Sequence, residues 1–295
     1  MPGPRLADMS GRVCVITGAT RGIGRATAEG LADLGATLEL VCRRREDGEA
    51  VAADLRRRGG QATVTVADLS SQRSIREAAD RIRSRHPALH VLINNAGVVP
   101  RQRQTTVDGL EMQFAVNHIA YFLLTRLLLD ALVAGAPSRI VNVSSGAHQG
   151  GTIDFADLQS ERRYDPVRVY GRTKLANILF TYELARRLRG TRVTVNCLHP
   201  GVIATQLLAD YMNVPGGGGA LAGTFSETPA QGSATSVYLA AGLEVEGVTG
   251  RYFVGESEDR SSRASYDVDA QRRLWEVSER LAGLTDGAAR EEATT

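Results

Sequence analysis

Short apolar runs rich in valine and isoleucine alternate along the chain with amphipathic stretches of about ten to twenty residues. This alternation predicts βαβ units, in which helices cover both faces of a parallel sheet. The clearest helical periodicity covers residues 22–34, 71–85, 107–133 and 169–188. The fold class is therefore α/β, a doubly wound parallel sheet of about seven strands, expected near residues 13–17, 38–42, 63–66, 91–94, 140–144, 193–198 and 251–254.

The chain of 295 residues is predicted to form a single domain, because neither an internal repeat nor a Ser/Pro-rich linker divides it. We expect an N-terminal extension at residues 1–10, the domain at 11–284 and a flexible tail at 285–295. Two segments, 146–169 and 206–229, break the alternation, and the second contains four consecutive glycines. Long irregular loops in a compact domain commonly carry function, so we predict that both are substrate loops.

Composition limits the partners of the protein. Lys and Arg number 35 against 33 Asp and Glu, which is too balanced for the basic surface that non-specific nucleic-acid binding requires. The three cysteines lie in predicted strands without CxxC spacing, so we expect buried, reduced thiols in a cytoplasmic protein. The five histidines lack the spacing of metal ligands, and no metal site is predicted. Neither a signal peptide nor a membrane span is predicted, because charges interrupt the most apolar window, 118–136.

The first predicted strand runs directly into a glycine-rich turn and then into a helix. Residues 17–24 read Thr-Gly-Ala-Thr-Arg-Gly-Ile-Gly. Glycines let the backbone approach a pyrophosphate closely, and the N-terminus of the following helix stabilises the negative charge. A glycine-rich turn without a ligand is the alternative for this motif taken alone. In this position the turn predicts a dinucleotide site of the Rossmann type.

The residues after the second predicted strand indicate which dinucleotide binds. An acidic residue at this position holds the adenine ribose in NAD-binding sheets, but here Cys42 is followed by Arg43, Arg44 and Arg45, and Arg21 lies in the glycine turn. A carboxylate would repel a 2′-phosphate, whereas a guanidinium binds it through charge-assisted hydrogen bonds. We therefore expect NADP(H), with Arg21 and Arg43 as its ligands. The other two arginines also suit the solvated start of a helix.

A phenol and an ammonium group lie on one face of a predicted helix, because Tyr170 and Lys174 are four residues apart. A nearby cation favours an ionised phenol, so we expect Lys174 to lower the pKa of Tyr170 toward neutrality. Ser144 and Ser145 end the fifth predicted strand, at the edge of the sheet where ligands bind. Each motif alone also suits a surface helix or a turn, and together they predict a catalytic site.

These motifs resemble the short-chain dehydrogenase/reductase family over about residues 10 to 285. The match in type and order rests on the glycine turn, Asn94-Asn95-Ala96-Gly97, Ser145, Tyr170-xxx-Lys174 and Pro200-Gly201. The chain is most similar to the retinol dehydrogenase-like branch, through Ala115–His118, Asn142–Ser145, Lys174–Phe180, His199–Val202 and Leu274–Ser278. That branch shares the long separation of 25 residues between the serine and the tyrosine, and the extra loop is expected at the substrate rim.

The resemblance implies roles for four catalytic residues. Tyr170 would be the general acid or base, and Lys174 would lower its pKa and hold the nicotinamide ribose. Ser145 would orient and polarise the carbonyl group. Asn117 would bend the long helix around it and hold a water that links Lys174 to solvent.

The resemblance also implies where NADP(H) binds. Asp68 and Leu69 would flank the adenine, residues 95–97 would follow the adenosine, and Pro200 to Thr205 would surround the nicotinamide. The full expected set is Gly18, Arg21, Gly22, Ile23, Gly24, Arg43, Asp68, Leu69, Asn95, Ala96, Gly97, Tyr170, Lys174, Pro200, Gly201, Ile203 and Thr205.

The predicted function is hydride transfer between NADP(H) and a small carbonyl or alcohol substrate of apolar character, with reduction as the cellular direction. The alternatives are a non-catalytic NADP(H)-binding sensor, a sugar-nucleotide epimerase or dehydratase, and a methyltransferase on a similar sheet. Relatives associate as homodimers or homotetramers, and some are monomers. We expect His148 in a surface loop and Trp275 packed against the domain, with contact to the substrate as the alternative for each. An apolar lid is expected from Leu207, Leu208, Tyr211 and Met212.

Overall fold

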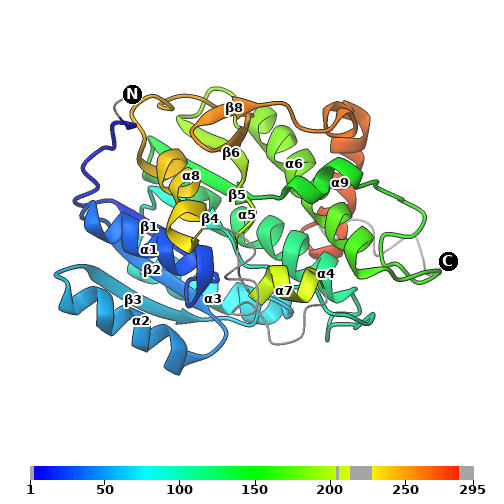
Figure 1. The fold of residues 1–295 in the computed structure, drawn as a ribbon, viewed down its shortest axis with the longest axis horizontal. Coiled ribbons are helices and arrows are strands. Elements are labelled where there is room, and N and C mark those ends of the chain that lie inside the picture. Colours follow the sequence, from blue (N-terminus) through cyan, green and yellow to red (C-terminus); the bar gives the residue numbers. More distant parts are fainter. Residues whose placement is uncertain (1–2, 204–205, 213–227, 286–295) are drawn as a thin grey trace.

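The computed structural model describes residues 3–203, 206–212 and 228–285. The strands are β1 (Val13–Thr17), β2 (Thr37–Cys42), β3 (Gln61–Val66), β4 (Val91–Asn94), β5 (Ser138–Val143), β6 (Val193–His199), β7 (Tyr252–Val254) and β8 (Ser257–Asp259). They form one sheet in the order β3-β2-β1-β4-β5-β6-β7-β8 (Figure 1). The first seven pair in parallel, and β8 is antiparallel to β7.

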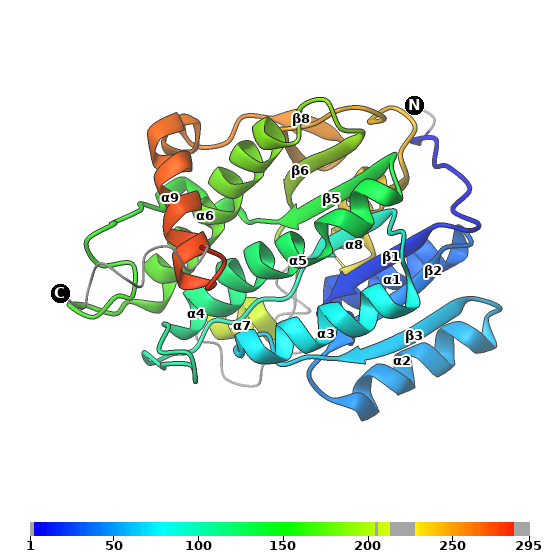
Figure 2. The ribbon, with the colours of Figure 1, turned by 180° about the vertical axis from the view of Figure 1, so that it is seen from behind.

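Helices cover both faces of this sheet, as the alternating pattern predicts. Figure 1 shows α1 and α8 in front of the sheet, and Figure 2 shows α3, α5, α6 and α9 on its other side. The α-helices are α1 (Gly22–Asp33), α2 (Arg45–Arg57), α3 (Gln72–Arg85), α4 (Met112–Phe114), α5 (Ala120–Ala134), α6 (Pro166–Arg187), α7 (Gln206–Met212), α8 (Pro229–Ala241) and α9 (Val268–Leu281). Shorter helical turns are the π-helical η1 (Ala115–Ile119) and the 3-10 turns η2 (Gly146–Gly150) and η4 (Arg263–Tyr266).

In the described part of the chain, two large hydrophobic clusters and a small third one fill the spaces between the sheet and its helices. One packs α3, α5, α6 and α9 on the sheet and includes Trp275, which is buried as predicted. The other large cluster packs α1, α2 and α8 on the opposite face. Because the central strands are covered on both faces, they are continuous apolar runs rather than alternating ones. The three predicted strand cysteines, Cys14, Cys42 and Cys197, are buried free thiols.

The order of the strands reverses at β1, and a ligand crevice is expected at the carboxyl end of the sheet there. Strand β1 lies between β2 and β4, so the connections leave it in opposite directions, and ligands of α/β sheets bind at such switch points. Thr17 at the end of β1 connects the two sides, because its Oγ1 accepts the N–H groups of Asn95 at 2.9 Å and Ala96 at 3.1 Å. The glycine turn is thereby held beside the turn that follows β4.

The structure adds elements that the apolar pattern does not indicate. Strand β8 has the sequence Ser-Glu-Asp and is exposed throughout, so it carries no hydrophobic signal and forms a polar sheet edge. The segment 206–229 was expected to be irregular, but its first part is the helix α7, and 213–227 lies outside the described residues. The described part of the N-terminal extension packs on the domain, since Leu6 bridges Gly242 and Met9 is 5% exposed.

The most apolar helical run lies in the core. Met112–Ala134, which comprises α4, η1 and α5, is long and apolar enough by length and composition to cross a membrane. In this protein 72% of its most apolar window is buried, and Phe114 and Phe122 have no exposed surface. Packing against the sheet therefore accounts for the apolar character of this run.

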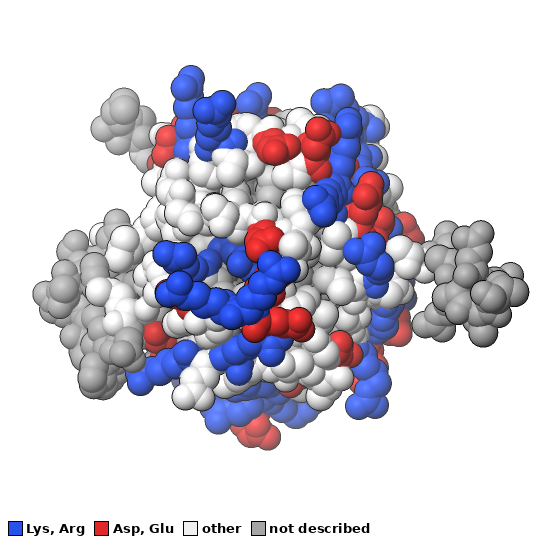
Figure 3. Space-filling view, turned by 90° about the vertical axis from the view of Figure 1, so that its right-hand side faces the viewer, with Lys and Arg blue, Asp and Glu red and all other residues white. Residues whose placement is uncertain are grey.

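The surface charges are mixed in sign. Figure 3 shows Asp and Glu side chains interspersed among the Lys and Arg side chains of one face. Elsewhere on the surface, charges pair within and between helices, as Arg25 does with Glu29 and Asp54. On this face the acidic groups interrupt the basic surface, in keeping with the balanced composition of the chain.

Candidate active site

Three elements bring the predicted catalytic residues together at the carboxyl end of the sheet. Ser145 follows β5 and is the N-cap residue of η2, while Tyr170 and Lys174 lie in the first three turns of α6. A Cβ atom on Gly151 would lie 2.5 Å from the carbonyl oxygen of Gly171, and one on Gly171 would lie 2.8 Å from that of Ala147. The two glycines thus let the backbone of η2 touch the backbone of α6, which brings the serine to the tyrosine.

The Tyr170 side chain is buried with its hydroxyl group hydrogen-bonded to the Ser145 side chain. Burial raises the pKa of this phenol, the hydrogen bond to Ser145 opposes that rise, and the nearby Tyr211 adds to it. The ring of Tyr211 covers the ring of Tyr170 at a centroid distance of 5.3 Å. At neutral pH the phenol is therefore protonated and able to donate a proton.

Lys174 is 2% exposed, and its ammonium group has few polar partners. Nζ donates a hydrogen bond to the carbonyl oxygen of Val143 at 3.0 Å. It also lies 5.4 Å from the ring centroid of Tyr170 and 5.8 Å from that of Tyr121, so two aromatic faces replace water around the cation. Burial lowers the pKa of Lys174 to about 7.

These shifts correct the expected effect of the lysine. The sequence predicts that Lys174 brings the pKa of Tyr170 toward neutrality, but the structure raises the phenol pKa by burial. The reason is that both groups are desolvated together, which disfavours the charged form of each. At neutral pH Tyr170 is therefore a neutral phenol, and beside it the amine of Lys174 has a pKa of about 7.

Asn117 lies in η1, where a π-helical turn interrupts the long helix that the sequence predicts to bend. Its side-chain amide makes two hydrogen bonds to the backbone of Val98: Oδ1 accepts the Val98 N–H at 2.8 Å, and Nδ2 donates to the Val98 carbonyl oxygen at 3.0 Å. Nδ2 also donates to Oγ1 of Thr173 at 3.2 Å. The side chain therefore ties α6 to the turn after β4, and its role in a proton relay stays a prediction.

The glycine turn has the geometry that close approach requires. Gly18 and Gly22 have φ angles of 68° and 55°, which favour glycine. A Cβ atom on Gly24 would lie 2.3 Å from the Gly18 oxygen. Asn95 Nδ2 donates to the oxygens of Thr17 at 2.9 Å and Gly18 at 3.3 Å, so this predicted cofactor ligand supports the turn from within the protein. The first turn of α1, which contains Ile23, has no acidic residue.

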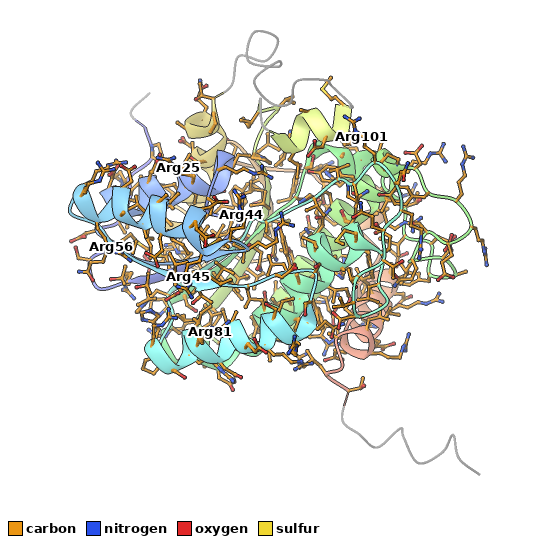
Figure 4. The ribbon with its side chains drawn as sticks, turned by 90° about the horizontal axis from the view of Figure 1, so that it is seen from below. Arg25, Arg44, Arg45, Arg56, Arg81 and Arg101 are labelled. Carbon is orange, nitrogen blue, oxygen red and sulfur yellow. The ribbon has the colours of Figure 1, made fainter. Side chains whose placement is uncertain are left out.

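The arginine run divides into paired and unpaired groups. Arg44 bonds both carboxylate oxygens of Asp47 at 2.7 Å, and Arg45 lies 3.8 Å from Glu49. Figure 4 shows both arginines at the start of α2. Within the described ranges, Arg43 and Arg21 are exposed and have no ion-pair partner. These two are the arginines that the sequence predicts as phosphate ligands.

The other predicted cofactor residues lie around the same crevice. Asp68 is exposed after β3, where Oδ1 accepts the N–H of Ser70 at 2.9 Å, and Leu69 beside it is half-buried. Ile203 is 4% exposed and packs on Gly232 of α8, where a Cβ atom would clash with it at 2.5 Å. Ala96, Gly97, Pro200 and Gly201 are half-buried in the turns after β4 and β6, and Thr205 lies outside the described residues.

Sequence reasoning missed several residues that shape the site. Tyr121 supports both sides of it, since its hydroxyl donates to the Ala96 oxygen at 2.8 Å and its ring faces Lys174. Thr17 and Tyr121 lie within apolar stretches of the sequence. The pattern there predicts only that they are buried, and it does not indicate their hydrogen bonds. Leu207 of α7 lies 3.4 Å from where a Gly97 Cβ would be, so with Tyr211 it contacts the site as the lid hypothesis requires. The closing movement of such a lid stays a prediction.

One expectation outside the catalytic group is wrong. His148 was expected in a surface loop, but it has no exposed surface, because η2 folds it inward against β7. Within the described ranges, no group of three or more His, Cys, Asp and Glu side chains could hold a metal ion.

The crevice fits a nicotinamide dinucleotide. It offers a helix N-terminus without acidic residues, two unpaired guanidinium groups near the end of β2, and a buried ammonium beside a protonated phenol. The chemistry of these donors suits phosphate groups at one end and ribose hydroxyls at the other.

Comparisons with known proteins agree with this site. A family model described as short chain dehydrogenase matches residues 12–213. Retinol dehydrogenase 14 of Mus musculus is 45% identical over 292 residues, which cover 94% of this chain and 87% of that protein. A solved structure of an uncharacterised protein from Mycobacterium paratuberculosis is 34% identical with a TM-score of 0.78, covering 94% of this chain and 96% of that one. A structure from Beutenbergia cavernae, described as an NAD(P)-dependent gluconate 5-dehydrogenase with bound NADP at low occupancy, is 28% identical with a TM-score of 0.68, covering 84% and 96%.

The chain therefore belongs to the short-chain dehydrogenase family, whose members bind a nicotinamide cofactor. It is an oxidoreductase that acts between CH–OH and C=O groups. Within the family it belongs to the retinol dehydrogenase-like branch, as the sequence motifs predict. This placement speaks against the alternatives of a non-catalytic sensor and of a methyltransferase.

The lowered pKa of Lys174 leads to a prediction that a single resonance can check. Lys174 is the only lysine among the 35 basic residues of the chain, so lysine labelled with ¹³C at Cε gives one side-chain signal. We expect this signal to titrate near pH 7 in the folded protein, instead of near the usual value of 10.5. A midpoint above pH 9 would contradict the burial of the amine.

The same shift links stability to pH. Between pH 7 and 10.5 the unfolded chain binds a proton at Lys174 that the folded chain has released, so the free energy of unfolding rises with pH there. Lys174→Met removes this contribution. Urea denaturation at several pH values should therefore give the wild type a steeper rise than the variant, by up to about 1.4 kcal/mol per pH unit. Equal slopes would contradict the prediction.

Proposed function

We propose that this protein is an NADP(H)-dependent enzyme that interconverts a carbonyl and an alcohol, with Tyr170 as the general acid or base and reduction as its cellular direction. The observation that carries the proposal is the buried Tyr170 side chain, which interacts with the Ser145 side chain and lies next to the buried Lys174. This arrangement offers a proton donor and a hydrogen-bond donor to one carbonyl oxygen. The preference for reduction rests on the high cellular ratio of NADPH to NADP⁺, an expectation from the cofactor.

The bound nicotinamide supplies the hydride, and the residues of the chain supply the placement and the proton. The Ser145 hydroxyl holds the substrate oxygen beside the Tyr170 hydroxyl, which gives its proton to that oxygen as negative charge develops. The amine of Lys174, with a pKa of about 7, gains or loses a proton at physiological pH. It can therefore return a proton to the phenol, with Asn117 holding the turn after β4 beside the amine.

The proposal of NADP(H) rests on unpaired charge near the end of β2. Arg44 and Arg45 are occupied by acidic residues of their own helix, whereas Arg21 and Arg43 have no such partner within the described ranges. Two unpaired guanidinium groups favour a 2′-phosphate, and no carboxylate stands at the end of the strand to repel it. The NADP bound in the Beutenbergia cavernae structure is in keeping with this choice.

We propose an apolar substrate, because the side chains that cover Tyr170 and Gly97 from α7 are Tyr211 and Leu207. The name of the mouse relative, retinol dehydrogenase, is in keeping with such a substrate. A cytoplasmic location and a homodimer or homotetramer complete the proposal and rest on the sequence alone.

Removing the phenol oxygen tests the proton donor. Tyr170→Phe should lower kcat by about 10² to 10⁴, which is the usual contribution of general acid catalysis. The Kd for NADPH should stay nearly unchanged, because the proposed phosphate contacts lie elsewhere. Turnover is followed by NADPH absorbance over a panel of aldehydes and ketones, and binding by NADPH fluorescence.

The control for this change is Tyr164→Phe. The Tyr164 hydroxyl accepts a hydrogen bond from Gln113 of α4 and donates one to the carbonyl oxygen of Pro100, so its partners differ from those of Tyr170. It should keep near-normal kcat. Comparable rates for the Tyr170 variant and the control would remove the basis of the proposed mechanism.

Two neighbouring charge reversals test the proposal of NADP(H). Arg43→Asp sets a carboxylate against the 2′-phosphate, and we expect the ratio of kcat/KM for NADPH over NADH to fall roughly ten- to a hundredfold, the cost of a lost charged hydrogen bond. Arg44→Asp introduces the same charge change one residue later, where the native side chain already pairs with Asp47. This control should change the ratio much less. Equal effects of the two changes would point to general electrostatics instead of a specific ligand.

A further inference from the structure

His148 has two hydrogen-bonded partners and no exposed surface. Its Nδ1 lies 2.6 Å from the carbonyl oxygen of Ser145, and its Nε2 lies 3.0 Å from the backbone nitrogen of Ser262. The ring also packs on the ring of Tyr252 in β7, at a centroid distance of 5.0 Å. The imidazole therefore bridges η2 and the chain segment that follows β8.

The partners define the protonation state of the ring. A carbonyl oxygen only accepts a hydrogen bond, so Nδ1 must carry the proton toward Ser145. A backbone N–H only donates, so Nε2 must be bare toward Ser262. The neutral tautomer with the proton on Nδ1 satisfies both contacts, and neither the other tautomer nor the charged form does.

This bridge connects the turn of Ser145 with α6, the helix that carries Tyr170. The Ser145 oxygen also accepts the backbone N–H of His148 at 3.1 Å, so two donors from one residue hold the same carbonyl group. On the other side, Ser261 next to Ser262 bonds the hydroxyl group of Tyr182 at 2.7 Å. Tyr182 lies on α6, the helix that carries Tyr170. The imidazole of His148 thus links the backbone of Ser145 to α6, in addition to the direct interaction between the Ser145 and Tyr170 side chains.

We propose that His148 is a positioning residue for Ser145, which fixes the carbonyl group of the serine and thereby the direction of its side chain. This inference rests on the proposed function, in which the Ser145 hydroxyl holds the substrate oxygen. Fixing the peptide plane after Ser145 restricts ψ, observed at 156°, and hence the orientation of the Cα–Cβ bond relative to β5. A small misplacement of a catalytic group costs up to about a hundredfold in rate.

Two amide substitutions separate the two contacts of the ring. An asparagine side chain places its amide where Nδ1 lies, so His148→Asn can keep the donor to the Ser145 oxygen while leaving the Ser262 N–H unpaired. A glutamine side chain reaches the place of Nε2, so His148→Gln can accept from Ser262 but loses the donor to Ser145. Both variants bury one amide group, so they share the stability cost of an imperfect polar contact.

The experiment compares kcat and the KM for NADPH in these variants, with thermal unfolding of each. We expect His148→Gln to lower kcat roughly tenfold or more, and His148→Asn to stay within about threefold of the wild type. The KM for NADPH should be unchanged in both, because Arg21 and Arg43 are not involved. Tyr252→Leu is the control, since it removes the ring contact without touching either hydrogen bond, and should lower stability but leave kcat unchanged.

Equal losses of kcat in the asparagine and glutamine variants, or no loss in either, would overturn the positioning role while leaving the proposed function intact. A wild type that turns over no carbonyl substrate with NADPH or NADH would overturn the proposed function, and the positioning role with it. The nitrogen NMR spectrum of the wild-type imidazole gives a test that needs no variant to fold. A proton on Nδ1 of His148 would support the positioning role, and a proton on Nε2 would contradict it.

Discussion

A single buried amine determines the chemistry of the crevice. The chain has 34 arginines and one lysine, and that lysine lies where a cation must fit between two aromatic rings and a carbonyl group. A guanidinium is always charged, whereas a buried ammonium can release its proton near neutral pH. The burial that lowers the pKa of Lys174 also keeps the Tyr170 phenol protonated, so one desolvated pocket gives both groups the protonation states that proton transfer needs.

The pocket exists because backbones come closer than side chains would permit. Gly151 and Gly171 let η2 lie directly on α6, and Gly18 and Gly24 let the first turn fold onto itself beside the turn after β4. At each contact a Cβ atom would meet a carbonyl oxygen or backbone carbon within 3.0 Å. Glycine is used here for its missing volume, and at Gly18 also for its positive φ. The distance from Ser145 to Tyr170 is thus a consequence of backbone packing.

The sequence predicts most of the fold and the membership of the site, but less of its electrostatics. Strands buried on both faces leave continuous apolar runs, which is why β1 and β4 are predicted to the residue. Strand β8 and helix α7 are not predicted. The three residues of β8 are polar and exposed, and α7 is short and precedes a glycine-rich segment, so neither carries a periodic hydrophobic signal. Helical spacing places Lys174 beside Tyr170, but only the tertiary packing reveals that both are desolvated. For the same reason, the polar contacts of His148 could not be read from its loop.

The arginine run shows how the start of a helix decides which charges remain available. Arg44 and Arg45 stand three and four residues before Asp47 and Glu49 on α2, so helix geometry brings each pair together. Arg43 also has acidic residues three and four positions later, Glu46 and Asp47, but it lies before the helix begins and makes no ion pair among the described residues. Exposed pairs of this kind add little to stability, but each engages a guanidinium that would otherwise attract an anion. The charge near the end of β2 is therefore concentrated on the residue that leads the run, closest to the strand and to the crevice.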